Sequence, residues 1–223
     1  MESKLIVALD VDSFQEAAAL VQVLRNQVEI FKVGSQLFTR VGPRIVEFLH
    51  EQGKECLLDL KFHDIPDAVA RAVESAVALK VRMLTLHIAG GDEMLRAAAS
   101  VAGHPLLLGV TGLTRVGGNV HTEAPRLARL AKKSGLNGVI ASPREIQPLR
   151  ELLGEKFLIV TPGIRPVKSE RGDQRRTMSP SEALIAGASY IVVGRPILTA
   201  TDPARMARGI AEEIAFTAGA SAR

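Results

Sequence analysis

The sequence contains no tryptophan, one tyrosine and one cysteine among 223 residues. Proteins that bind single-stranded nucleic acid rely on several exposed aromatic side chains, so this composition argues against that class of partner. The single cysteine, Cys56, cannot form an intramolecular disulfide, which favours a reducing, cytoplasmic location. Cys56 lies in an apolar run, and this context predicts a buried small hydrophobe rather than a catalytic thiol.

Long hydrophobic runs are also missing. Five apolar residues precede Asp10, which is too short a run for a signal peptide, and no stretch approaches the roughly 20 residues of a membrane span. We therefore expect no membrane association. The net charge is +4, with Lys and Arg spread along the chain. This distribution favours a small anionic ligand over nucleic acid.

What the sequence does contain is a regular alternation of short apolar runs and longer amphipathic stretches. The runs cover residues 5–9, 30–33, 57–60, 83–86, 106–110, 138–141, 157–160 and 190–193. Nearly continuous apolar character predicts parallel strands covered on both faces. Helix-start signals lie between the runs: Ser13 with Glu16 three residues later, and Pro66 in a first turn. Eight such units without a linker predict a single α/β domain, a (β/α)8 TIM barrel over residues 1–223.

The structural alternative is a doubly wound open sheet. The Gly-rich dinucleotide-binding fingerprint that often follows the first strand of such sheets is replaced by LDVD at residues 9–12, which disfavours this alternative. A long irregular segment runs from Gly163 to about Met178. In a barrel it would follow the seventh strand at the catalytic face, where long loops serve as lids or clamps.

Charged residues follow several of the predicted strands. Asp10 follows the first, Lys32 lies at the end of the second, and Asp59 and Lys61 at the end of the third. A charge in such a setting is costly unless it is paired, and alternating Asp and Lys would supply the pairing. Asp59 and Lys61 are two apart, so on an extended segment both would point to one face, whereas Asp64 would project elsewhere. The alternative is a structural salt-bridge cluster, but charges from consecutive strand ends favour an active site.

The last two strand ends predict a phosphate site. Gly194 and Arg195 follow the eighth run, and Arg165 follows the seventh. Loops after strands seven and eight commonly bind phosphate in barrels, and a guanidinium can bind phosphate oxygens bidentately. An exposed surface Arg is the alternative. His87 is interpreted as a hydrogen-bonded strand-end histidine, and neither zinc-ligand spacing nor a serine nucleophile elbow occurs.

Seven short motifs carry a resemblance to a known family. They are ALD at 8–10, FKVG at 31–34, DLKFHDIP at 59–66, GVT at 109–111 with LT at 113–114, TPGIRP at 161–166, GDQRR at 172–176 and VGRPI at 193–197. With these motifs the sequence resembles bacterial orotidine 5′-phosphate decarboxylases over essentially its full length. The D-x-K-x-x-D core alone is shared with related phosphosugar barrels, so the complete set carries the specificity.

The resemblance implies cofactor-independent decarboxylation of orotidine 5′-monophosphate to uridine 5′-monophosphate, the last step of de novo pyrimidine nucleotide synthesis, without a metal. Lys61 would donate the proton to ring carbon 6 after carbon dioxide leaves. Asp59 and Lys61 would belong to a charged array completed by Lys32 and by Asp64 from the neighbouring subunit of a homodimer. Ile65 would likewise serve the neighbour's site.

The resemblance also implies substrate contacts. Asp10 and Lys32 would bind the ribose hydroxyls. The family often has Thr at the position of Ala68, so a hydroxyl contact to ribose would be lost here or replaced by backbone. The remaining implied contacts are Thr114 at the pyrimidine edge, Gln174 between base and phosphate, Gly194 and Arg195 at the phosphate, and Arg165 in the phosphate and lid region.

Two other functions stay open. One is a magnesium-dependent decarboxylase or aldolase acting on a 3-keto sugar phosphate. Such relatives carry an acidic metal ligand at the end of strand two, where this chain has Lys32. The other is a nucleotide-binding barrel without turnover, which would be expected to lose Lys61 or its Asp partners.

Overall fold

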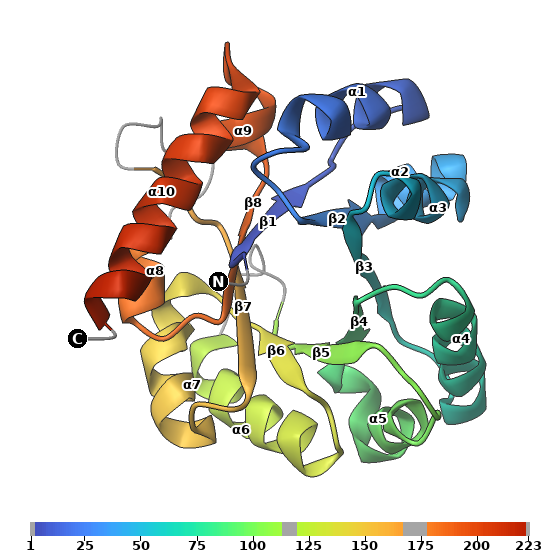
Figure 1. The fold of residues 1–223 in the computed structure, drawn as a ribbon. Coiled ribbons are helices and arrows are strands. Elements are labelled where there is room, and N and C mark those ends of the chain that lie inside the picture. Colours follow the sequence, from blue (N-terminus) through green and yellow to red (C-terminus); the bar gives the residue numbers. More distant parts are fainter. Residues whose placement is uncertain (1–2, 113–119, 167–177, 222–223) are drawn as a thin grey trace.

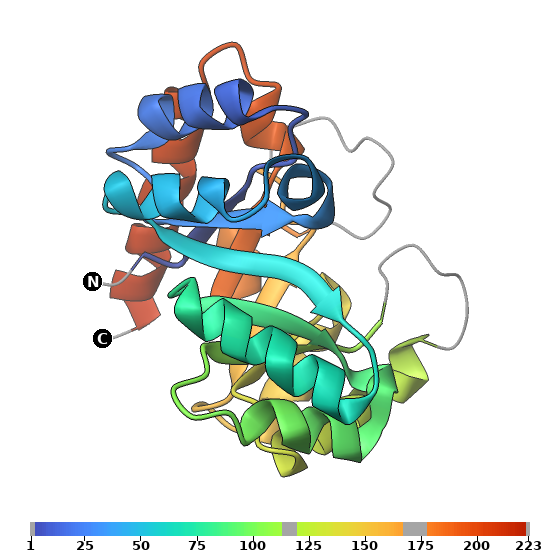
Figure 2. The ribbon, with the colours of Figure 1, turned by 90° about the vertical axis from the view of Figure 1, so that its right-hand side faces the viewer.

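The computed structural model describes residues 3–112, 120–166 and 178–221. Within these residues, eight parallel strands close into a barrel in sequence order, and the helices surround it (Figure 1). Figure 2 shows both termini on one side of the barrel, while β3 points toward the other side. The strands are β1 (Leu5–Ala8), β2 (Ile30–Gly34), β3 (Glu55–Phe62), β4 (Met83–His87), β5 (Leu106–Val110), β6 (Gly138–Ile140), β7 (Leu158–Pro162) and β8 (Tyr190–Val193).

The predicted barrel is confirmed, because β1 pairs with β8 as well as with β2, so the sheet formed by the described strands is closed. The strand bounds differ from the apolar runs mainly at the C-terminal end of β3, which continues through the charged residues to Phe62.

The helices are α1 (Phe14–Leu24), α2 (Ser35–Val41), α3 (Arg44–Glu51), α4 (Pro66–Ala78), α5 (Gly91–Ala99), α6 (Val120–Lys133), α7 (Ile146–Leu153), α8 (Pro180–Ile185), α9 (Arg195–Leu198) and α10 (Pro203–Ser221), with 3₁₀ turns at Ile88–Gly90 and Pro143–Glu145.

The helix starts follow local chemistry. The amide of Glu16 donates to Ser13 Oγ at 3.2 Å, which caps α1 as predicted. The Glu16 carboxylate accepts from the amide of Asp12 at 3.1 Å, whereas in a regular capping box it would accept from the amide of Ser13. Pro66 is the first residue of α4, where its missing N–H costs no helical hydrogen bond. These two signals define where α1 and α4 begin.

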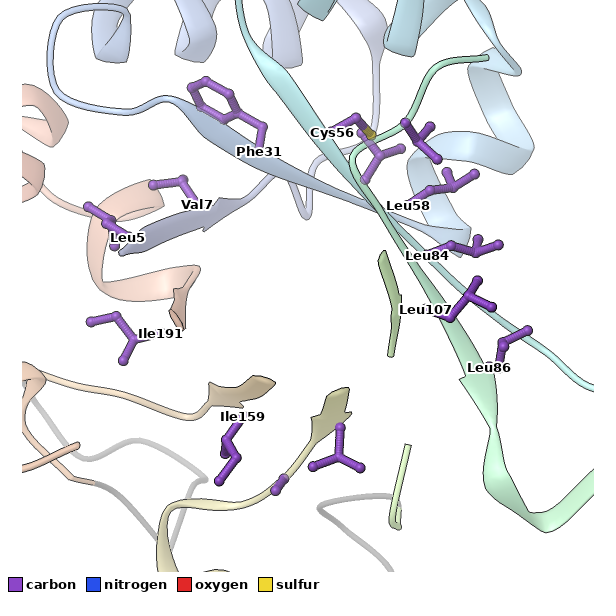
Figure 3. Close-up of a cluster of buried hydrophobic side chains, with 14 of the residues drawn as sticks. Leu5, Val7, Phe31, Cys56, Leu58, Leu84, Leu86, Leu107, Ile159 and Ile191 are labelled. Carbon is purple, nitrogen blue, oxygen red and sulfur yellow. The ribbon is translucent and has the colours of Figure 1, made fainter. Parts of the chain in front are cut away.

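Apolar side chains form two clusters because neighbouring strand residues point to opposite faces. The smaller cluster draws on all eight strands and no helix, so it fills the barrel interior. Its buried members are Ile6, Ala8, Ile30, Leu57, Met83, Leu108, Val160, Tyr190 and Val192, and β6 contributes the partly buried Ile140. The larger cluster lies between strands and helices, and Figure 3 shows part of it, including Val7, Phe31 and Leu84. Cys56 belongs to this outer cluster, where burial raises the pKa of its thiol to about 12, so the prediction of a buried hydrophobe is confirmed.

None of the helices in the described parts of the chain is long and apolar enough to cross a membrane.

Candidate active site

Polar side chains continue the inward face of the barrel beyond its apolar interior. On the first four strands the last inward apolar residues are Ala8, Ile30, Leu57 and Met83. Two positions further along each strand the side-chain direction repeats. Those positions hold Asp10, Lys32, Asp59 and Thr85. The strand period therefore gathers these four side chains at the carboxyl ends of the strands, where barrel enzymes carry their active sites.

A charged array of alternating ion pairs is formed by Asp10, Lys32, Asp59 and Lys61. Lys32 Nζ lies 2.9 Å from Asp10 Oδ1 and 3.6 Å from Asp59 Oδ2. Lys61 Nζ lies 2.7 Å from Asp59 Oδ1. The two central side chains, Lys32 and Asp59, are each 14% exposed, whereas Lys61 is 32% and Asp10 54% exposed. The array is thus buried at its centre and open at both ends, where a ligand can reach it.

The environment of Asp59 holds it in the ionised form. Burial alone would raise the pKa of this carboxyl, but the positive charges of Lys32 and Lys61 and hydrogen bonds from Lys61 and Thr85 outweigh burial. The pKa of Asp59 therefore lies below its ordinary value. An ionised Asp59 in turn keeps a negative charge between the two ammonium groups.

The geometry of β3 differs from the regular extended segment that the sequence predicted. The pairing with β4 passes from Leu58↔Leu84 to Phe62↔Leu86, so β3 contains two more residues than β4 over this stretch. Lys61 has φ 52°, in the left-handed region that side chains other than glycine rarely adopt. Asp59 and Lys61 do meet, as predicted, but they do so across an irregularity that re-aims the Lys61 side chain.

Thr85 is a site residue that was not recognised in the sequence. Its side chain is fully buried, its Oγ1 accepts from the amide of Lys61 at 2.9 Å, and its hydroxyl donates to Asp59 Oδ1 at 3.0 Å. The available signal was a hydroxyl at an inward position of an apolar strand. The residues that it joins are 24 and 26 positions away in sequence, so their contact was not visible there.

Two histidines lie beside the array. The rings of His63 and His87 have centroids 5.6 Å apart and are tilted by 50°. Burial lowers the pKa of His87, the neighbouring His63 and Lys61 lower it further, and Asp59 acts in the opposite direction. His87 is therefore electrostatically coupled to the charged array, a setting that its position in the sequence did not reveal.

The turn before α4 faces outward. Asp64 does not join the four-charge array; its Oδ1 accepts from the amide of Ile65 at 2.7 Å, and both residues are exposed. Ile65 is 67% exposed and lies next to the exposed Asp64. The prediction that Asp64 projects away from Asp59 and Lys61 is consistent with this geometry. Ala68 lies partly buried in the first turns of α4.

The end of β8 closes the other side of the site. A Cβ added at Gly194 would lie 3.5 Å from Asp10 Oδ2, so this backbone packs directly beside the start of the array. Arg195 is exposed and begins α9. The Arg165 amide donates to the Met178 carbonyl at 3.0 Å, and Arg165 Nε is buried without a hydrogen-bond partner among the described residues. Thr114 and Gln174 lie outside the described residues.

Across the described ranges, no group of three or more His, Cys, Asp or Glu side chains is placed to hold a metal ion. The Lys32 ammonium pairs with both carboxylates of the array, Asp10 and Asp59. A divalent cation bound there would face that positive charge directly, which is electrostatically unfavourable.

Comparison with known proteins assigns the family. The family model described as "Orotidine 5'-phosphate decarboxylase / HUMPS family" matches residues 3–210. Proteins named orotidine 5′-phosphate decarboxylase from Syntrophotalea carbinolica and Moorella thermoacetica are 48% and 46% identical, over 95% and 96% of this chain and 95% and 92% of theirs. A crystal structure of orotidine 5′-phosphate decarboxylase from Lactobacillus acidophilus superposes with a TM-score of 0.84 at 36% identity, covering 96% of this chain and 99% of that one. The chain therefore belongs to the orotidine 5′-phosphate decarboxylase / HUMPS family.

Proposed function

We propose that this protein is a carboxy-lyase that converts orotidine 5′-monophosphate to uridine 5′-monophosphate and carbon dioxide without a cofactor, in pyrimidine nucleotide biosynthesis. The observation that carries the proposal is the alternating chain Asp10–Lys32–Asp59–Lys61 at the carboxyl ends of the first three strands. The relatives that match nearly the whole chain bear the name of this activity.

The chemistry requires stabilisation of negative charge. Loss of carbon dioxide from a ring carbon leaves a localised carbanion, and the Lys61 ammonium can both stabilise that charge and supply the proton that replaces the carboxylate. One such ion pair at about 4 Å and an effective dielectric near 20 contributes on the order of 4 kcal/mol. Enzymes lower barriers by roughly 8–23 kcal/mol, so Lys61 alone is insufficient.

Binding energy from the rest of the nucleotide must supply much of the difference. In this proposal Asp10 and Lys32 bind the ribose hydroxyls, and Arg195 with the backbone of Gly194 binds the phosphate. The closeness of Gly194 to Asp10 supports it, because it brings the proposed phosphate and ribose contacts to one side of the barrel mouth. The further proposed contacts are Arg165 near the phosphate, Gln174 between base and phosphate, Thr114 at the pyrimidine edge and Ala68 near the ribose.

We also propose a homodimer in which Asp64 and Ile65 complete the neighbour's site. The exposed apolar side chain of Ile65, next to an exposed carboxylate, supports this proposal because a partner surface would bury it.

Mixing Lys61→Ala and Asp64→Asn subunits tests the shared site. Random exchange should restore about a quarter of the wild-type activity, since half of the dimers are hybrid and each hybrid has one intact shared site. Failure to restore activity in verified hybrids would place Asp64 in its own subunit's site.

The magnesium-dependent alternative is disfavoured by the Lys32 ammonium, which pairs with both carboxylates. Incubation of the purified protein with orotidine 5′-monophosphate, with and without EDTA, separates the two functions by loss of the pyrimidine absorbance. Turnover of the nucleotide that survives chelation supports the proposal. No turnover of the nucleotide, together with EDTA-sensitive turnover of a 3-keto sugar phosphate, would support the alternative. Binding without turnover would identify a non-catalytic nucleotide-binding barrel.

The Lys61→Ala variant tests the role of the ammonium group. Turnover should be abolished while binding of uridine 5′-monophosphate remains measurable. Unchanged turnover would remove Lys61 from the mechanism.

A further inference from the structure

A closed ring of hydrogen bonds joins two strands beneath the charged array. The Lys61 amide donates to Thr85 Oγ1, the Thr85 hydroxyl donates to Asp59 Oδ1, and Lys61 Nζ donates to the same Asp59 oxygen at 2.7 Å. The ring thus links the backbone of Lys61, the hydroxyl of Thr85 and the carboxylate of Asp59.

The chemistry of the three groups allows one direction of donation. A backbone N–H can only donate and an ionised carboxylate can only accept. The hydroxyl of Thr85 must therefore accept from Lys61 and place its single proton on Asp59. A hydroxyl is the smallest side-chain group that can perform both functions at one atom, and a methyl group in its place could perform neither.

The position of Thr85 means that it acts through its neighbours. Its side chain is fully buried, so a substrate in the barrel mouth cannot touch it. Lys61 adopts φ 52° in the stretch of β3 between Leu58 and Phe62 where the register against β4 shifts, and its amide donates to Thr85 Oγ1 there. An unfavourable backbone conformation persists only where surrounding contacts favour it, and this hydrogen bond is such a contact.

We propose that Thr85 is a positioning residue of the decarboxylase site, which holds the Lys61 backbone in its left-handed conformation and orients the Asp59 carboxylate toward the Lys61 ammonium. The inference rests on the proposed function. It adds β4 to the three strands that carry the charged array and assigns a role to a residue that does not touch substrate.

The test compares two substitutions that differ in a single functional group. Thr85→Val keeps the shape and removes the hydroxyl, whereas Thr85→Ser keeps the hydroxyl and removes a methyl group. Loss of hydrogen bonds to a charged group and a buried amide should lower kcat by roughly tenfold to a hundredfold in Thr85→Val. The KM should change by less than about threefold, because Thr85 does not contact the substrate and its loss removes no binding interaction with it. Thr85→Ser should stay within about threefold of wild type.

A matched control removes a buried hydroxyl elsewhere. Thr217 on α10 is 8% exposed and donates to the Glu213 carbonyl at 2.9 Å, so Thr217→Val loses a helical side-chain hydrogen bond without altering the array. Its kcat should equal that of wild type. If Thr85→Val does not fold, Thr85→Cys takes its place because a thiol is a weak donor and acceptor, and it should lose kcat where Thr85→Ser does not.

A readout that needs no turnover separates this inference from the proposed function. The carboxyl carbon of Asp59 can be followed by NMR as the pH is lowered. It should titrate at higher pH in Thr85→Val than in wild type or Thr85→Ser, because a hydrogen bond to the charged form is lost.

Inactivity of the wild-type protein toward orotidine 5′-monophosphate would overturn the proposed function alone. Equal kcat losses in Thr85→Val and Thr85→Ser, or an unchanged titration of Asp59 in Thr85→Val, would overturn the positioning role.

Discussion

Replacing Asp59 by Asn should destabilise the fold, because it leaves two ammonium groups facing a neutral amide. Lys61 Nζ lies 2.7 Å and Lys32 Nζ 3.6 Å from the carboxylate. At an effective dielectric of about 20 these separations correspond to gross attractions of about 6 and 5 kcal/mol. Desolvation offsets most of this sum, and breaking a buried pair by removing one partner typically costs about 3–5 kcal/mol. Since Lys61 is 32% exposed, we expect the lower end, about 3 kcal/mol.

The assay is urea and thermal unfolding of wild type and Asp59→Asn. For a chain of this size each kcal/mol lowers the Tm by about 2–4 °C, so the Tm should fall by about 6–12 °C. The matched control is Asp67→Asn, which removes an exposed pair with Arg71 (72% and 75% exposed) and should cost less than about 1 kcal/mol. An Asp59→Asn variant as stable as wild type would refute the assignment of a paired, buried charge.

The pH dependence gives a second check on the same variant. The pKa of folded Asp59 lies below its ordinary value, so its contribution to stability is fully present above the unfolded pKa of about 4 and is lost as pH falls through the folded pKa. The difference in unfolding free energy between wild type and Asp59→Asn should therefore stay constant from about pH 8 to 5. A difference that disappears as pH falls from 7 to 5 would contradict the lowered pKa.

Three further predictions concern other parts of the barrel. Arg150→Met removes a largely buried guanidinium that donates to three backbone carbonyls near the N-terminal ends of β7 and β8. In urea unfolding this variant should be less stable by at least about 3 kcal/mol, with kcat unchanged. A variant as stable as wild type would contradict this prediction. In an NMR titration His87 should show a midpoint below the ordinary histidine value of about 6.5, and His63→Ala should raise it; a wild-type midpoint at or above 6.5 would contradict the assigned environment. Arg195→Ala should raise the KM for the nucleotide by about tenfold or more with a smaller change in kcat, whereas a loss confined to kcat would argue against phosphate binding.

The sequence predicted the barrel because its signals are local. Each strand is a short apolar run, and caps such as Ser13 and first-turn prolines such as Pro66 satisfy the chain within a few residues. The inward positions of Asp10, Lys32 and Asp59 also follow from the two-residue period of a strand, so the alternating array was expected before its distances were known.

Only the tertiary structure determined how the third strand ends. The left-handed backbone of Lys61 depends on a register change against β4 and on the hydroxyl of Thr85, 24 residues away. Such contacts depend on which strands become neighbours and in which register, and no local propensity encodes that information. The sequence by itself thus determined the eight-stranded barrel and the kinds of charge at its mouth. The packing of β3 on β4 determined where the Lys61 ammonium points, because two segments distant in sequence must come together to satisfy one buried amide and one buried carboxylate.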